Sequence, residues 1–232
     1  MGTYTLDVFR DGLQFELGQR TDVKSPTNWY TTWINTAYIG LTTSHLLPEI
    51  GKVFVFPELM VDNAGATTTT DGTAYITTPT DALYVEYLWD STHDRLLKWM
   101  SWDDYMNTSG RADTNAEGDP TRYTRRGTKI YLSPTPGTTG DVLYVYYRKR
   151  PHVLDGSTYN TTVLSDEWDE PILKLALIQS LRRLKEYDFA EMEKKAWVED
   201  VAGKIRIYGR EELNRDANFQ VDKQYLEGGR AR

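Results

Sequence analysis

Apolar residues near the start of the chain recur with the period of an α-helix. The positions i, i+3, i+7 and i+11 of the first pattern are Leu6, Phe9, Leu13 and Leu17. Thr5 precedes them and is a residue type that caps helix N-termini. A second helical pattern follows a polar turn, and its apolar positions are Tyr30, Trp33, Ile34, Ala37, Tyr38 and Leu41. Two amphipathic helices are therefore predicted before residue 50.

From about residue 51 the apolar positions repeat every two residues. The segments with this pattern are rich in β-branched and aromatic side chains, which favour strands; they are 53–56, 74–76, 83–87, 128–132 and 142–147. The last two are predicted to pair through a connection at 134–140. No helical pattern of crossover length separates consecutive strands, so the sheet is predicted to be mostly antiparallel.

Helical periodicity returns after 165–169, where Ser and Asp are good capping residues and Pro171 fits a first helical turn. The third helix is apolar on two faces, which are marked by Leu173, Leu177, Leu181 and Leu184 and by Ile172, Leu175 and Ile178. It is therefore predicted to pack between neighbours. A fourth helical pattern has its apolar positions at Phe189, Trp197, Val201, Ile205 and Tyr208.

The order of these patterns predicts an α+β fold, in which a bundle of about four helices is interrupted by an inserted, mostly antiparallel β module. Neither pair of helices is large enough to bury its apolar faces alone, so the bundle is expected to be discontinuous, with residues 1–50 and 163–213. The β module is expected at 51–162. Residues 214–232 show little periodicity and are predicted to form an extended C-terminal tail.

Composition narrows the class of protein. The chain is 39% hydrophobic and 12% aromatic, which is too apolar for disorder, yet it has no apolar run as long as a membrane span. It contains no cysteine, so disulfides and thiolate metal sites are excluded. Its start lacks the apolar segment of a secretory signal.

The net charge of −7 is unevenly distributed. Residues 1–110 hold 6 Lys and Arg against 14 Asp and Glu, whereas residues 111–162 hold 8 against 5. No segment concentrates the positive charge that binding to a phosphate backbone requires. Tight nucleic-acid binding is therefore not expected.

Catalytic and cofactor motifs are missing from the sequence. The three histidines, His45, His93 and His152, lack the spacing of a zinc site, and there is no phosphate-binding glycine loop or nucleophile turn. The adjacent Asp103 and Asp104 would point about 100° apart on a helix and would not share a ligand. The chain is thus expected to have no catalytic, metal or cofactor site and not to be an enzyme. A small enzyme with an unrecognised site is the competing hypothesis.

Two groups of side chains could bind a partner. The predicted strand pair could gather a basic patch for an acidic partner or a passing phosphate backbone; its members are Arg122, Arg125, Arg126, Arg148, Lys149 and Arg150. A solvated strand end is the alternative. Strand aromatics could stack on sugars, although they are more commonly cross-strand packing; they are Tyr84, Tyr87, Trp89, Tyr144, Tyr146 and Tyr147.

Three stretches carry a resemblance to a known family. One is Trp33-Ile34-Asn35-Thr36-Ala37-Tyr38, and another is 131–136 leading into 143–151. The third begins at Pro171-Ile172-Leu173 and runs through 184–188 into the charged fourth helix. Together with the order of the elements, they make the chain resemble the head-to-tail adaptor (connector) proteins of tailed bacteriophages.

This resemblance implies a structural virion protein that assembles as a ring, expected to be a dodecamer, between the portal and the tail. The ring would enclose a channel for DNA passage without specific DNA binding or membrane contact. The other partners would be the portal protein and a downstream tail or nozzle protein. The location would be the neck of the virion, after assembly in the host cytoplasm.

The tail, 214–232, is expected to dock on a portal subunit. Its composition cannot bury a core but can lie along a groove, and its expected contact residues are Phe219, Val221, Tyr225, Leu226 and Arg230. Plain terminal disorder is the alternative for this segment. For the whole chain, the alternative function is a tail-fibre or baseplate component that binds carbohydrate through the aromatics of the β module.

Overall fold

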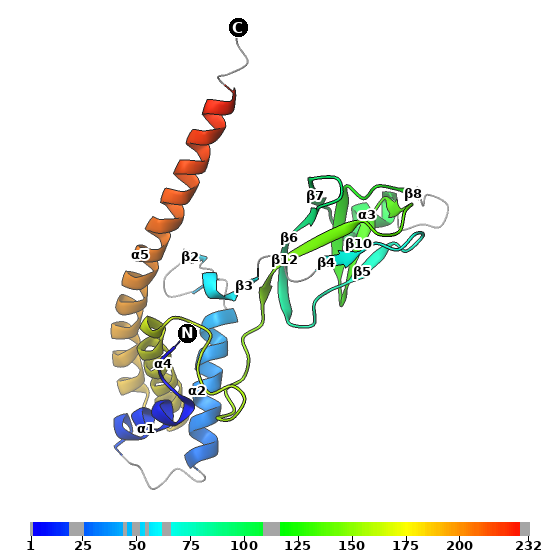
Figure 1. Ribbon diagram of the computed structural model, residues 1–232. Coiled ribbons are helices and arrows are strands. Elements are labelled where there is room, and N and C mark those ends of the chain that lie inside the picture. The colour runs from blue at the N-terminus through cyan, green and yellow to red at the C-terminus, as the bar shows by residue number, and fades with distance from the viewer. Residues whose placement is uncertain are drawn as a thin grey trace. The chain divides into compact units, whose positions relative to one another are not determined.

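The computed structural model describes residues 2–18, 26–43, 46–47, 52–53, 56–61, 66–108 and 117–227; the side chains of 26–27, 46–47, 52–53, 66 and 208–227 lie outside this description. The chain divides into two compact units (Figure 1). Met1–Val55 and His152–Arg232 form the first, called here the helical unit, and Phe56–Pro151 form the second, called the β unit. Helices and a mixed curled sheet together make the fold α+β, as predicted.

The helical unit contains α1 (Leu6–Glu16), α2 (Pro26–Thr43), the 3-10 helix η2 (Asp166–Trp168), α4 (Asp169–Arg183), α5 (Tyr187–Glu227) and the short antiparallel strands β1 (Leu46–Leu47) and β2 (Lys52–Val53). Helix α4 contacts α1, α2 and α5, and α1 also contacts α2. The two-sided apolar pattern of α4 is explained by this central position, because Ile172, Leu177 and Ile178 are all buried.

Helix α1 has the start and the end that the sequence predicts. The Thr5 hydroxyl accepts a hydrogen bond from the Val8 backbone N–H at 3.3 Å, which satisfies a donor that the first helical turn leaves free. Phe9 and Leu13 are buried on one face. The helix is followed by Gly18, whose φ of +66° is a conformation that glycine adopts without strain.

A buried carboxylate ties the start of the chain to α4. Asp169 is only 1% exposed, and its Oδ2 accepts hydrogen bonds from the backbone N–H groups of Thr3 at 2.7 Å and Tyr4 at 2.8 Å. The expected cap is absent: Trp168 occupies the cap position of α4 and makes no side-chain hydrogen bond to it. The Asp169 carboxylate serves the N-terminal segment instead.

Asp169→Ala is expected to lower the free energy of unfolding by about 2–3 kcal/mol, because two partly buried backbone N–H groups lose a charged acceptor. Urea denaturation followed by circular dichroism measures this change. Asp166→Ala is the matched control, since Asp166 is exposed one turn earlier. Equal stability of the two variants would contradict the role given to Asp169.

Residues 152–162 belong to the helical unit, although the sequence analysis assigned them to the β module. Asn35 on α2 holds this segment by two bonds: its Nδ2 donates to the Leu154 carbonyl at 2.9 Å, and its Oδ1 accepts from the Leu154 N–H at 2.8 Å. The Tyr38 hydroxyl accepts from the Val163 N–H at 3.2 Å, and burial raises the pKa of Tyr38 to about 12. Irregular backbone at this position is thus paired with α2 side chains.

The β unit contains one eight-stranded sheet, in the order β3-β12-β6-β7-β9-β10-β5 with β4 also paired to β12. Its elements are η1 (Pro57–Leu59), β3 (Met60–Val61), β4 (Ala66–Thr68), β5 (Tyr75–Thr77), β6 (Ala82–Asp90), β7 (Arg95–Trp99), α3 (Trp102–Thr108), β8 (Glu117–Gly118), β9 (Arg122–Arg126), β10 (Lys129–Ser133), β11 (Thr135–Pro136) and β12 (Val142–Lys149). The core of the sheet includes Leu88, Leu97, Ile130, Leu132, Leu143 and Val145.

One expectation about strand pairing is wrong, whereas the eight-stranded sheet is mostly antiparallel as predicted. The strands β10 and β12 do not pair with each other: β10 lies between β9 and β5, and β12 pairs with β3, β4 and β6. One pair in the sheet is parallel, with Lys98 on β7 opposite Arg122 on β9, and the connection between these strands contains α3. Of the expected strand at 53–56, Val53 belongs to β2 and Phe56 leads into η1 outside any strand, while residues 54–55 lie outside the described part of the chain.

Helix α5 is longer than expected at its C-terminal end. It runs to Glu227, so residues 214–227 are helical and do not form an extended tail. Trp197, Val201 and Ile205 are buried as predicted, but Phe189, which was placed on the same face, is 61% exposed. No helix among the described residues is long and apolar enough to span a membrane.

Candidate interaction surfaces

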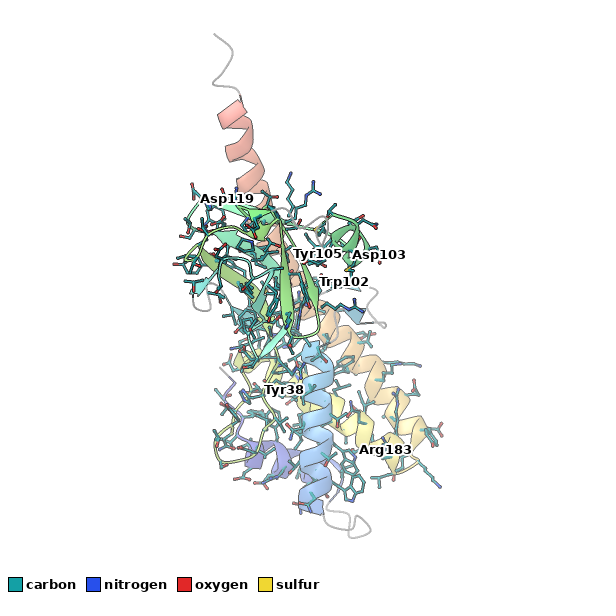
Figure 2. The ribbon with its side chains drawn as sticks, turned by 90° about the vertical axis from the view of Figure 1, so that its right-hand side faces the viewer. Tyr38, Trp102, Asp103, Tyr105, Asp119 and Arg183 are labelled. Atoms are coloured by element: carbon teal, nitrogen blue, oxygen red, sulfur yellow. The ribbon has the colours of Figure 1, made fainter. Side chains whose placement is uncertain are left out.

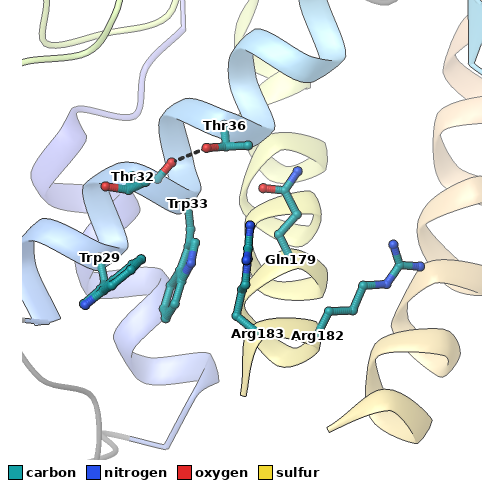
Figure 3. Close-up of a pocket in the computed structure, with 7 residues that line it drawn as sticks. All are labelled: Trp29, Thr32, Trp33, Thr36, Gln179, Arg182 and Arg183. Atoms are coloured by element: carbon teal, nitrogen blue, oxygen red, sulfur yellow. Dashed lines mark hydrogen bonds between the residues drawn. The ribbon is translucent and has the colours of Figure 1, made fainter. Parts of the chain in front are cut away.

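A groove of about 350 Å³ lies between α2 and α4 (Figure 3). It is lined by Trp29, Thr32, Trp33, Thr36, Gln179, Arg182 and Arg183. Trp29 is 48% exposed, whereas Trp33 is almost buried, and the centres of their rings are 6.0 Å apart. The two α2 indoles therefore form an aromatic wall that faces α4.

The charge that remains unpaired in this groove is positive. Arg182 is directed toward α5, where its Nη2 donates to Glu191 Oε1 at 2.8 Å. Arg183 extends beside the Trp33 ring instead, and among the described residues no carboxylate pairs with it. Among the described residues, the buried Nε1–H of Trp33 has no hydrogen-bond acceptor. Aromatic and arginine side chains together are typical of the centre of a protein interface.

This groove could not be predicted from the sequence, because it is formed by two helices that are far apart in the chain. Trp29 lies one helical turn before Trp33, outside the predicted apolar stripe of α2. The threonine hydroxyls of the groove could not be recognised as binding groups either, because they donate to backbone carbonyls of α2 itself. Thr32 donates to the Asn28 carbonyl at 2.8 Å and Thr36 to the Thr32 carbonyl at 2.7 Å, as Figure 3 shows for the second bond.

Four of the six predicted basic residues lie near the first half of β6. Arg125 donates to the carbonyls of Leu83 at 2.9 Å and Ala82 at 3.2 Å. Arg148 Nη2 donates to Glu86 Oε1 at 2.7 Å. Lys149 lies opposite Ala82 in the register of β12 and β6, and the Arg150 N–H donates to the Asp81 carbonyl at 2.7 Å. Two of these guanidinium groups are therefore bound to groups of the β unit itself.

The other two basic residues are directed elsewhere. The Arg126 guanidinium carbon lies 4.4 Å from the centre of the Trp102 ring on α3, a cation–π contact. Trp102 and Tyr105 also pack on each other, with ring centres 5.2 Å apart (Figure 2). Arg122 is exposed at the opposite end of β9, where it pairs with Ser133 of β10.

Two of the strand aromatics stack on each other, and another is buried. Tyr87 on β6 and Tyr146 on β12 are stacked, with ring centres 4.4 Å apart, and Trp89 lies opposite Tyr144 in the same register. Tyr147 is buried, and its hydroxyl donates to Asp81 Oδ1 at 2.7 Å. Tyr84 is half exposed. Stacking of one ring on the other covers faces that a sugar would need.

The histidines occupy structural positions where they are described; His45 lies outside the described residues. His93 in the turn between β6 and β7 has its Nδ1 2.8 Å from buried Asp90 Oδ2 and its Nε2 3.5 Å from Asp119 Oδ2. Because both ring nitrogens of His93 face carboxylate oxygens, neither is placed to take a proton from a nucleophile. The His152 ring stacks on Tyr159 at 4.3 Å. Among the described residues, no group of three His, Asp or Glu side chains could hold a metal ion.

The expected contact residues of the C-terminal segment lie at the end of α5. Positions 219, 221, 225 and 226 are helical, but the side chains of Phe219, Val221, Tyr225 and Leu226 lie outside the described part of the chain, as does all of Arg230. In a helix, positions seven residues apart share a face. Position 219 therefore shares a face with 226, and position 221 with 225, which is four residues away.

Comparison with known proteins identifies the family. Among curated proteins, none matches the chain. The family model described as SU10 adaptor protein matches residues 6–220, which include α1, the β unit and nearly all of α5. This family consists of phage head-tail adaptors, which are structural proteins of the virion neck that interact with other head-tail proteins, and it is not a class of enzymes. The chain belongs to the SU10 adaptor family of phage head-tail adaptor proteins.

Proposed function

We propose that this adaptor forms a ring, with twelvefold symmetry, between the portal and the tail, and that DNA passes through the channel of the ring. The match of the family model to residues 6–220 carries this proposal. A head-tail adaptor must contact one protein on the head side, another on the tail side, and copies of itself. In this chain, we expect different helices and strands to make these three kinds of contact.

Exposed apolar side chains on the helices support contacts with other subunits. Phe15 on α1 is 76% exposed, and Phe189, Met192 and Ile207 on α5 are also largely exposed. Phe189 and Met192 are three residues apart and therefore share a face of α5, and contiguous exposed apolar side chains are commonly covered in an assembly. In the proposed ring these helical surfaces face neighbouring subunits.

Charge supports a channel that does not retain DNA. The chain has a net charge of −7, and the guanidinium groups of Arg125 and Arg148 are already bound to carbonyl and carboxylate oxygens. On the β unit as a whole, 10 Lys and Arg are outnumbered by 13 Asp and Glu, so no excess of positive charge is available to neutralise phosphates. DNA can pass such a surface without specific binding.

The portal contact is proposed at the end of α5, with Phe219, Val221, Tyr225, Leu226 and Arg230 as its residues. Helix α5 runs to Glu227, and the last of its residues that is described as buried is Ile205. The end of a helix can lie in a groove of a partner. The β unit is proposed to contact the downstream tail or nozzle protein.

Mass measurement of the purified protein, alone and mixed with purified portal rings, tests this function. We expect a discrete complex in which each portal ring carries the same number of adaptor copies as portal subunits. A chain that binds immobilised glycans through the β unit and ignores portal rings would contradict the proposal. That result would favour a tail-fibre or baseplate role.

A further inference from the structure

The outer face of α1 carries an apolar and acidic stripe. Because Phe9 and Leu13 point into the core, the residues on the opposite side of the helix point outward. These are Val8, Asp11 and Phe15, at i, i+3 and i+7; all three are exposed. Phe15 is the most exposed large apolar residue in the described part of the chain. We call Val8, Asp11 and Phe15 the α1 stripe.

The groove lined by Trp29, Trp33 and Arg183 is complementary to this stripe in chemistry. It offers a half-exposed indole to an apolar side chain and an unpaired guanidinium to a carboxylate. Phe15 and Asp11 are four residues apart, which places a ring and a carboxylate one helical turn from each other. Among the described residues, no cation pairs with Asp11, just as no carboxylate pairs with Arg183.

The two surfaces lie on different sides of α2. The Arg10 Nε on α1 donates to the Thr31 hydroxyl at 2.9 Å, so Thr31 marks the side of α2 that faces α1. Trp29, which marks the groove, is two residues earlier, and two residues turn a helix by about 200°. The groove and α1 are therefore on nearly opposite sides of α2, and one copy cannot join them itself.

We propose that the groove of one copy binds the α1 stripe of a second copy, with Phe15 against the Trp29 indole and the Asp11 carboxylate on the Arg183 guanidinium. This contact rests on the proposed ring and names the surfaces that build it. It joins two different surfaces, so an open row of copies keeps one free groove at one end and one free stripe at the other until the assembly closes. Such head-to-tail contacts produce rings when the rotation between neighbouring copies closes, whereas a contact between identical surfaces would stop at a dimer.

Charge reversal tests the pair. Arg183→Glu and Asp11→Arg each place like charges together, and each should weaken subunit association by roughly 10- to 100-fold, measured by mass photometry with and without portal rings. An equimolar mixture of the two variants should recover assembly, because every contact in an alternating ring again joins opposite charges. Arg122→Glu is the control, as an exposed arginine of the β unit with the same charge change.

A second variant tests the apolar half of the contact. Phe15→Ser should also weaken association while leaving the melting temperature unchanged, because Phe15 is exposed in the single copy. If the natural chain assembles and these variants assemble equally well, or if the mixture fails to recover, the proposed contact is wrong although the ring stands. If the natural chain forms no ring even with portal rings, both the contact and the proposed function are contradicted.

Discussion

Leu177→Asp is expected to unfold the helical unit. Leu177 is buried on α4, the helix that contacts α1, α2 and α5, so the new carboxylate would lie among apolar side chains without a partner. Burying an unpaired charge costs several kcal/mol, and a typical domain is stable by only about 5–15 kcal/mol. Circular dichroism and thermal melting should show a loss of helix or a melting temperature lowered by well over 10 °C.

Two further variants separate the effect of charge from the effect of lost volume. Leu177→Ala should cost about 2–4 kcal/mol and leave the unit folded, because it creates a cavity but buries no charge. Lys174→Asp changes a partly exposed residue of the same helix and should have a small effect. A soluble Leu177→Asp variant with an unchanged melting temperature would show that α4 is not the centre of the unit.

Helices with strong local signals could be predicted from the sequence. Thr5, the spacing from Leu6 to Leu17, and Gly18 each specify α1 within one stretch of chain, and the structure has the helix there. The end of α5 is different, because its sequence has little of the apolar periodicity by which an amphipathic helix is recognised. Residues 214–227 were therefore not recognised as helical.

Strand partners could not be predicted in the same way. Residues 134–140 looked like the connection of a hairpin, but Thr135 pairs in parallel with Glu117, and β12 reaches back to β6. Pairing depends on contacts between distant segments, which the alternation of side chains within one strand does not encode. The predicted basic patch depends on the same error, because it assumed that β10 and β12 are neighbours, and they are not.

The interaction surfaces depend both on the periodicity within one helix and on contacts between distant segments of the chain. Asp11 and Phe15 share a face because of helical period, which the sequence shows. The groove needs α2 beside α4, two helices separated by the whole β unit, and only the fold shows this. Arg182 and Arg183 illustrate the difference: they are adjacent in sequence and both line the groove, but Arg182 is bound to Glu191 whereas Arg183 has no described carboxylate partner.

Deleting residues 214–232 is expected to abolish co-assembly with portal rings while leaving the melting temperature nearly unchanged. The described core contacts of α5 end at Ile205, so the removed segment should contribute little to the stability of the helical unit. In a ring, each copy would add one such helix to the same portal, and linked weak contacts bind far more tightly together than singly. Pull-down on purified portal rings, with the melting temperature as the parallel measurement, gives both quantities.

Paired substitutions then identify the face of the helix that docks. Phe219→Ser with Leu226→Ser alters one face of the helical segment, and Val221→Ser with Tyr225→Ser alters the other. One pair should weaken portal binding much more than the other, because a helix in a groove buries one face. Arg230→Ala tests the last expected contact residue. If the truncated chain joined portal rings with undiminished affinity, the portal contact would have to lie elsewhere on the chain.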